Sequence, residues 1–222
     1  MRTPFVRTVF AIVRKDLKAE MRSRELINAM ALFALLSMLV FSFALALNRE
    51  VRTEVIGGIL WVTLIFSSIL GLNRSLANEQ DAGGLDAMLM APVPRTAVFV
   101  GKLTGNFVFV LVIGLILLPL ITILYNITLS LLLMLPVLVL GTLGFATIGT
   151  LLATMTVQTH SRETLLPLVM MPIALPILML AVRATRAAVL NEADPLALLT
   201  LLALDMLYLT ICTLMFEYVI ES

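Results

Sequence analysis

Long apolar runs alternate with short polar segments along almost the whole chain. A run of about 20 apolar residues is what a helix needs to cross the hydrocarbon core of a bilayer. We place six such spans, at residues 27–47, 54–72, 103–125, 131–155, 164–182 and 196–217. The break after the third span, Asn126-Ile127-Thr128, is short and uncharged, which predicts a tight turn at a bilayer face. The pattern predicts an all-α polytopic membrane protein, with residues 1–222 forming a single transmembrane domain.

The segment before the first span, residues 5–24, has a different pattern. Its apolar residues recur at spacings of three and four, and basic residues fill the other face. The apolar set is Val6, Val9, Phe10, Val13, Leu17 and Met21, and the basic set is Arg7, Arg14, Lys15, Lys18 and Arg22. This periodicity is typical of a helix lying in the membrane interface. The alternative is a solvated arm that only anchors the topology.

The longest polar interruption, residues 73–102, lies between the second and third spans. It begins with a polar, acidic run that contains Glu79 and Asp81 and continues through Gly83-Gly84. A short amphipathic stretch follows, and Pro92 and Pro94 end it. A protein that only had to cross the bilayer would not need this segment, so we interpret it as a docking lever for a partner protein.

The composition agrees with a membrane protein. Hydrophobic residues make up 61% of the 222 residues and charged residues only 13%, against about 25% charged in a soluble domain. Eleven of the 15 Lys and Arg residues fall on the side of the membrane that holds residues 1–26 and 73–102. The positive-inside rule therefore predicts that both termini and the 73–102 loop are cytoplasmic.

Several kinds of site are excluded by residue counts and spacing. The single Cys212 excludes an intrachain disulfide and a cysteine-cluster metal site, and the single His160 excludes two-histidine ligation. Gly101-Lys102 has the ending of a P-loop, but Thr96 stands where the first glycine is required. We therefore expect no metal site and no ATP site in this chain, and the ATPase of any ATP-driven machine would be another polypeptide.

Catalysis is not expected either. An intramembrane protease needs a base beside a serine, or paired aspartates, within its spans. The only histidine lies outside the spans, and Asp205 is the only acid deep within one. We predict that the chain has no catalytic residue and no nucleic-acid partner.

Asp205 itself lies near the middle of the sixth span. An ionised, unpaired carboxylate there costs about 2.5–3.5 kcal/mol on insertion scales. Two interpretations stay open. Asp205 is a functional site within the membrane, or its carboxyl is satisfied structurally by Tyr208, Thr210 or a threonine of the fourth span.

Prolines and small residues mark two other spans. Pro167, Pro172 and Pro176 predict that the fifth span is kinked or broken, because each removes a backbone donor. That span is either a locally adapted packing helix or a flexible element near a transport path.

Small residues recur in the fourth span and at the start of the third, and they let helix backbones approach closely. The glycines concerned are Gly101, Gly105, Gly141, Gly144 and Gly149. Packing within the subunit is their first interpretation, and a homodimer seam is the second. Trp61 lies well inside the second span, so it is not expected to be an interface anchor.

Two sequence blocks carry a family resemblance. Residues 57–103 read GGILWVTLIFSSILGLNRSLANEQDAGGLDAMLMAPVPRTAVFVGKL. The second block comprises 141–156 (GTLGFATIGTLLATMT) and 165–181 (LLPLVMMPIALPILMLA). Together with the length and the six spans, they closely resemble the membrane permease of the cytochrome c maturation system, the haem exporter B subunit family (CcmB), of the ABC-2 type. One departure is Asn73-Arg74, where many members carry an acidic-basic pair.

The resemblance implies a half-transporter in the bacterial cytoplasmic membrane. Two copies would pair as a homodimer with two copies of a cytoplasmic ABC ATPase subunit and with the haem-handling membrane subunit of the same system. A coupling helix at about Gly84–Ala91 would sit in a groove of the ATPase. The ATPase-coupling residues would be Glu79, Asp81, Gly84, Leu85, Met88, Leu89 and Pro92. This chain would hold no cofactor, since the ATPase binds ATP and the complex handles haem.

The cargo stays open at this point. ATP hydrolysis would drive either haem export or the release of a haem-loaded chaperone from the partner subunit. The alternatives are an ABC-2 permease for a lipid, glycan or drug, an ion-coupled secondary transporter that uses Asp205, and a structural membrane scaffold.

Overall fold

The computed structural model describes residues 5–44, 49–81, 93–156 and 162–221. Within these residues the chain forms seven α-helices and no strand. They are α1 (Phe5–Ser23), α2 (Glu25–Ala44), α3 (Arg49–Asp81), α5 (Arg95–Tyr125), α6 (Leu131–Thr156), α7 (Arg162–Val189) and α8 (Pro195–Glu221). The predicted all-α class is confirmed.

Six of these helices, all but α1, are long and apolar enough to cross a membrane, counted over the described residues. The six spans are Glu25–Ala44, Thr53–Ser75, Arg95–Tyr125, Leu131–Met155, Leu165–Val189 and Pro195–Tyr218. The largest differences from the sequence prediction are at three boundaries: α3 continues past residue 72 to Asp81, α5 starts before residue 103, and α7 continues past residue 182. Hydropathy locates only the apolar part of a helix, whereas backbone hydrogen bonds carry it on through polar residues.

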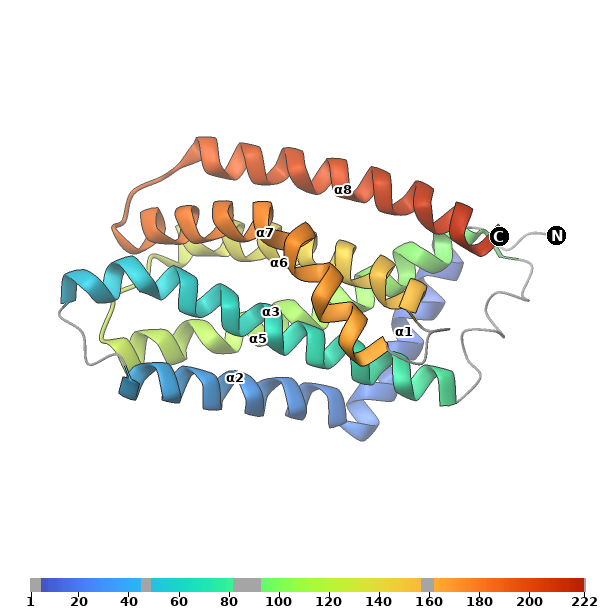
Figure 1. Ribbon diagram of the computed structural model, residues 1–222, viewed down its shortest axis with the longest axis horizontal. Helices are drawn as coiled ribbons and strands as arrows, with labels where there is room; N and C mark the ends of the chain where they lie inside the picture. Colours follow the sequence, from blue (N-terminus) through green and yellow to red (C-terminus); the bar gives the residue numbers. More distant parts are fainter. Residues whose placement is uncertain (1–4, 45–48, 82–92, 157–161, 222) are drawn as a thin grey trace.

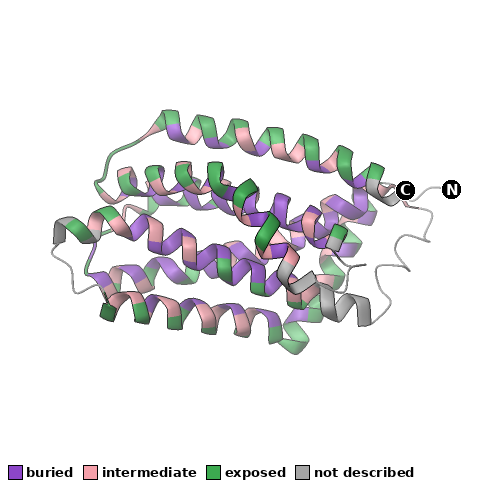
Figure 2. Cartoon of the chain, viewed as in Figure 1, coloured by how far each residue is buried: buried purple, intermediate pink, exposed green. Residues whose placement is uncertain are grey.

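The six spanning helices lie lengthwise beside one another, and α1 crosses one end of the bundle at a steep angle (Figure 1). Buried residues concentrate in the middle of the bundle, while α2 and α8 show mainly exposed and half-buried positions (Figure 2). Large apolar residues such as Leu199, Met206 and Leu214 lie exposed along α8. An apolar outer surface suits a bundle surrounded by lipid.

The corner between α1 and α2 is closed by a side chain. Arg24 takes a left-handed backbone conformation with φ 56°. The buried carboxylate of Glu20 then accepts a hydrogen bond of 2.8 Å from the backbone N–H of Ile27, in the first turn of α2. This bond satisfies one of the orphan donors that every helix N-terminus leaves. The N-terminal helix is therefore held at a fixed angle to the first span.

Trp61 lies at the centre of the core. Its side chain is fully buried, and its Nε1–H donates a 2.9 Å hydrogen bond to Thr185 Oγ1 of α7. Its ring packs on Phe145 of α6, with ring centroids 5.8 Å apart, and against Gly141. A Cβ on Gly141 would lie 2.1 Å from Trp61 Cη2. Trp61 is thus a core residue, and Gly141 serves packing within the subunit, as predicted.

The prolines of α7 bend the helix without breaking it. α7 is helical from Arg162 to Val189, and it changes direction along its length (Figure 1). Pro172 and Pro176 lie on its exposed side, while Ala174 and Ile177 pack inward. The hydroxyl of Tyr208 in α8 donates a 2.9 Å hydrogen bond to the carbonyl of Ile173, within this proline-rich segment. The predicted kink is confirmed, and the helix remains continuous because its inner face is packed.

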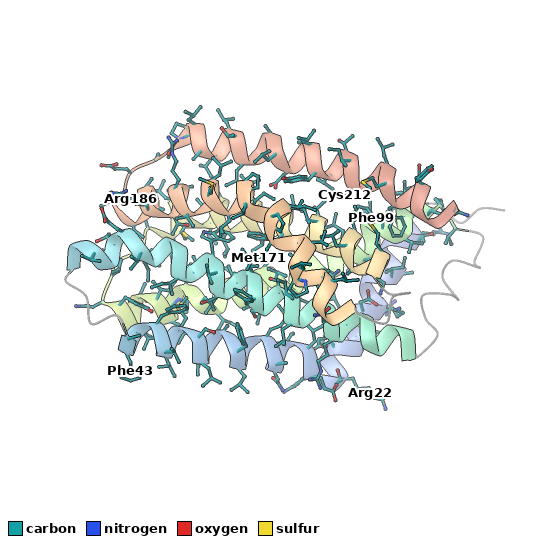
Figure 3. The ribbon with its side chains drawn as sticks, in the orientation of Figure 1. Arg22, Phe43, Phe99, Met171, Arg186 and Cys212 are labelled. Carbon is teal, nitrogen blue, oxygen red and sulfur yellow. The ribbon has the colours of Figure 1, made fainter. Side chains whose placement is uncertain are left out.

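Turns at the opposite end of the bundle from α1 carry specific caps. Asn126 ends α5 in the left-handed conformation, φ 51° and ψ 47°, which gives the tight turn that its uncharged sequence predicted. Asp194 caps α8, since its Oδ1 accepts a 3.0 Å hydrogen bond from the backbone N–H of Ala197. Arg183 of α7 donates a 2.8 Å hydrogen bond to Asp194 Oδ2. Arg186, labelled in Figure 3, pairs with Glu54 of α3 at 3.1 Å, far from Arg22 at the other end.

Candidate functional site

The candidate site is the end of the bundle where α1 lies. The C-terminal end of α3, the start of α5 and the C-terminal end of α8 lie at the same end (Figure 1). Of the predicted coupling residues, Glu79 and Asp81 fall in the last turns of α3. The other five, Gly84, Leu85, Met88, Leu89 and Pro92, lie outside the described residues. Their role therefore stays a prediction.

Helices enter and leave the predicted loop directly. The apolar span of α3 ends at Ser75, yet the helix continues to Asp81. Pro94 precedes α5, and its carbonyl accepts backbone hydrogen bonds from Ala97 and Val98. Both ends of the 73–102 segment, taken from sequence as loop, are thus helical. A force applied between them would reach the spans through regular helices.

The N-terminal helix packs closely on the start of α5. Gly101 faces Ile12 of α1, and a Cβ on Gly101 would lie 2.9 Å from the Cβ of Ile12. Gly105 lies next to Asp16, where a Cβ would make ordinary contact at 3.6 Å. The Gly101–Gly105 pair therefore seats α1 within the subunit, which is the first of the two uses proposed for these glycines.

An ion pair fixes the same contact. Lys102 Nζ lies 3.0 Å from Asp16 Oδ2, and the two side chains are only 10% and 17% exposed. Lys15 also approaches Asp16, with 3.3 Å between its Nζ and Asp16 Oδ1. Sequence reasoning identified Lys102 only as the residue of a false P-loop. The sequence did carry a signal for a contact of this kind. Two acidic residues, Asp16 and Glu20, lie four residues apart in a helix whose other charged residues are all basic.

The faces of α1 differ in part from the sequence prediction. Its buried residues are Thr8, Ile12 and Glu20, rather than the apolar stripe. Three members of that stripe are exposed: Met21, and also Val6 and Phe10, which lie beside the basic side chains. Val6 and Phe10 line a shallow groove together with Arg7, Ala11, Arg14, Lys15 and Lys18. The helix thus presents apolar and basic groups outward, which suits a position in the membrane interface.

A small second core joins α1, α5 and α8 at this end. Ile12, Phe99, Cys212 and Phe216 belong to it, and the rings of Phe99 and Phe216 have centroids 5.1 Å apart. Figure 3 shows Phe99 and Cys212 near each other toward this end of the molecule. The final helix is therefore packed against the same α1–α5 unit that borders the predicted coupling segment.

Asp205, the intramembrane candidate, lies away from this end, in the middle of α8. Its side chain is fully buried, and neither oxygen has a hydrogen-bond partner among the described residues. The structural partners that the sequence suggested are engaged elsewhere, because Tyr208 donates to Ile173 and Thr210 to Met206. Four threonines of α6, Thr142, Thr147, Thr150 and Thr154, donate to carbonyls of their own helix. That structural interpretation of Asp205 is wrong.

Comparison with known proteins gives a family. The chain matches the family model described as "CcmB protein" over residues 7–221. It is 28% identical over 192 residues to a Rhodobacter capsulatus protein named "Heme exporter protein B", which covers 85% of this chain and 88% of that protein. The family match extends from within α1 to the end of α8, two helices that lie outside the sequence blocks that carried the resemblance. The chain belongs to the CcmB family.

Proposed function

We propose that this chain is the membrane subunit of a bacterial haem export system for cytochrome c maturation. Its family and the name of its relative support the membrane and haem-export assignment. We further propose that a separate cytoplasmic ABC ATPase subunit supplies the energy, since the sequence has no complete P-loop. Two copies of the chain would form the permease, with both termini cytoplasmic, beside a haem-handling membrane subunit.

The observation that supports ATPase coupling most strongly is the rigid frame around the 82–92 segment. α3 enters this segment and α5 leaves it as regular helices. The Asp16–Lys102 pair and the Ile12–Gly101 contact fasten α1 to α5. A partner that displaced the segment would therefore move α3, α5 and α1 together.

The proposed contact is amphipathic. Leu85, Met88 and Leu89 recur at helical spacing and would enter an apolar groove of the ATPase, while Pro92 fixes the exit. Glu79 and Asp81 at the end of α3 would form an acidic recognition surface. ATP binding shifts the spans only through a difference in contact energy between two states, so this contact must differ between the nucleotide states of the ATPase. The same coupling serves haem transfer or release of a haem-loaded chaperone.

The test is a charge placed in the proposed groove contact. Leu85→Asp or Leu89→Asp should insert normally but lose copurification of the ATPase, or leave ATP turnover without cytochrome c assembly. Ala87→Asp is the matched control, because it adds the same charge on the opposite side of the predicted helix. Normal cytochrome c assembly in Leu85→Asp, with the ATPase still bound, would contradict the proposal. Haem-dependent activity that persists without ATP would favour an ion-coupled transporter.

A further inference from the structure

Asp205 lies at a junction of three helices, half-way along each span. Gly144 is near the middle of the α6 span, and Ile177 is near the middle of the α7 span. A Cβ on Gly144 would lie 2.6 Å from Asp205 Oδ1 and 2.4 Å from Ile177 Cδ1. The carboxyl group is therefore pressed against the backbone of α6 at a position where only glycine leaves room.

No described group compensates a charge at this junction. α8 packs on α5, α6 and α7, and α6 carries no charged or titratable residue. On α7, Arg183 pairs with Asp194 and Arg186 pairs with Glu54, both at one end of the bundle. The other ionisable groups of these four helices are Arg95, Lys102 and Tyr125 on α5, Arg162 and Glu163 at the start of α7, and Tyr208, Cys212, Glu217, Tyr218 and Glu221 on α8. Lys102 is held by Asp16.

The polar groups nearest along α8 are engaged as well. Tyr208, one turn from Asp205, donates to the carbonyl of Ile173. Cys212, on the same side of α8, is buried in the small apolar cluster with Phe99 and Phe216. An ionised carboxylate without a partner at mid-membrane depth is far more costly than a neutral carboxylic acid, because the neutral form has no net charge to desolvate.

We propose that Asp205 is a proton-binding site at the junction of α6, α7 and α8. The carboxyl holds its proton while α8 is packed on Gly144. When α8 moves away and water reaches the group, the O–H bond breaks, the proton passes to water and the carboxylate remains. Closing the junction takes up one proton. This site is separate from the ATPase contact, so its failure in a test leaves the proposed coupling at residues 84–91 untouched.

The test observes the aspartate carboxyl groups directly. The chain carries five aspartates, Asp16, Asp81, Asp86, Asp194 and Asp205. The full chain, labelled with 13C at its aspartate carboxyls and placed in lipid nanodiscs, is measured by infrared or NMR spectroscopy at neutral pH. We expect one labelled group to be a protonated acid, and its signal to disappear in Asp205→Asn or on unfolding. If Asp205→Asn does not fold, a chain with Asp205 as its sole aspartate must show the acid signal.

A second readout tests proton uptake on closing. If the folded chain holds a proton that the unfolded chain releases, stability falls as the pH rises. Relative to Asp205→Asn, the thermal midpoint of the wild type should therefore fall as the pH rises from the ordinary carboxyl pKa of about 4 to the pH at which folded Asp205 loses its proton, and stay level above that pH. Glu192→Gln should follow the wild type. Five ionised aspartates at neutral pH, or parallel pH profiles for the wild type and Asp205→Asn, would overturn the proposal.

Discussion

Asp16 in α1 and Lys102 in α5 form a partly buried ion pair, with 3.0 Å between Lys102 Nζ and Asp16 Oδ2, and it joins two segments that lie 86 residues apart in the sequence. Lys102 lies in the third turn of the first helix after the proposed coupling segment. Gly101, its neighbour, receives Ile12 from the same face of α1. These two contacts fasten the amphipathic helix α1 to α5. Motion of α5 must carry α1 with it.

Breaking this pair should loosen α1. Asp16→Asn or Lys102→Met removes the 3.0 Å contact and leaves the other charge partly buried with fewer partners, which should cost about 1–3 kcal/mol of stability. The double variant should recover part of the loss, because neither charge then remains. Thermal unfolding of the detergent-purified chain measures each value. Arg74→Gln is the control, since its pair with Glu25 is about half exposed and should contribute at most about 1 kcal/mol. A loss in the double variant equal to the sum of the two single losses would show that the two residues do not interact.

Gly141 should not tolerate a methyl group. Its Cβ would lie 2.1 Å from the ring of Trp61, so Gly141→Ala forces the indole or α6 to shift, at a cost of about 3 kcal/mol or more. Gly58→Ala is a matched control, because a Cβ there meets nothing within 4 Å. That control should be neutral or stabilising by up to about 1 kcal/mol, the helix preference of alanine over glycine. Similar thermal midpoints for the two variants would contradict this packing.

The hydrogen bond between Trp61 and Thr185 can be tested by fluorescence, because Trp61 is the only tryptophan in the chain. Thr185→Val keeps the shape of the side chain but leaves the buried indole N–H without its acceptor. We expect a loss of about 1–3 kcal/mol and a blue shift of the emission. Thr185→Ser should retain most of both properties. An unchanged emission and stability in Thr185→Val would mean that the bond does not form.

The sequence predicted the spans well because the bilayer imposes a length and an apolar composition on each one separately. The sequence also predicted the turn at Asn126 and the kink at the α7 prolines, since left-handed caps and missing backbone donors are local properties. Helix ends were less accurate. α3 and α5 continue into segments whose polarity indicates a loop, because a helix remains stable where its backbone bonds continue.

Contacts between distant segments were not predictable. The pairing of Asp16 with Lys102 depends on how α1 crosses the bundle, which no local pattern specifies. The isolation of Asp205 was missed for a related reason. One of the two interpretations left open by the sequence was that hydroxyl groups close in sequence, such as those of Tyr208 and Thr210, reach the carboxyl. In a helix, however, a hydroxyl readily bonds a carbonyl of the preceding turn or of a neighbour. The proposed groove contacts at Leu85 and Leu89 lie outside the described residues.

The cap of α8 makes a prediction about pH. The backbone N–H of Ala197 and, next, the guanidinium of Arg183 hold the pKa of Asp194 below its ordinary value of 3.8. A lowered pKa in the folded state adds stability above the ordinary value, and this contribution is lost as the pH falls through the lower, folded value. Asp194→Asn isolates the charge, since asparagine is also a good N-cap. Asp194→Ala removes both the charge and the cap.

At neutral pH the thermal midpoints should therefore rank wild type above Asp194→Asn, and Asp194→Asn above Asp194→Ala. On acidification below the ordinary carboxyl pKa, the wild type should approach Asp194→Asn, because its carboxyl becomes neutral as well. The gap between Asp194→Asn and Asp194→Ala should stay constant, because the amide cap does not titrate. A gap between wild type and Asp194→Asn that persists in acid would show that charge is not what Asp194 contributes to the start of α8.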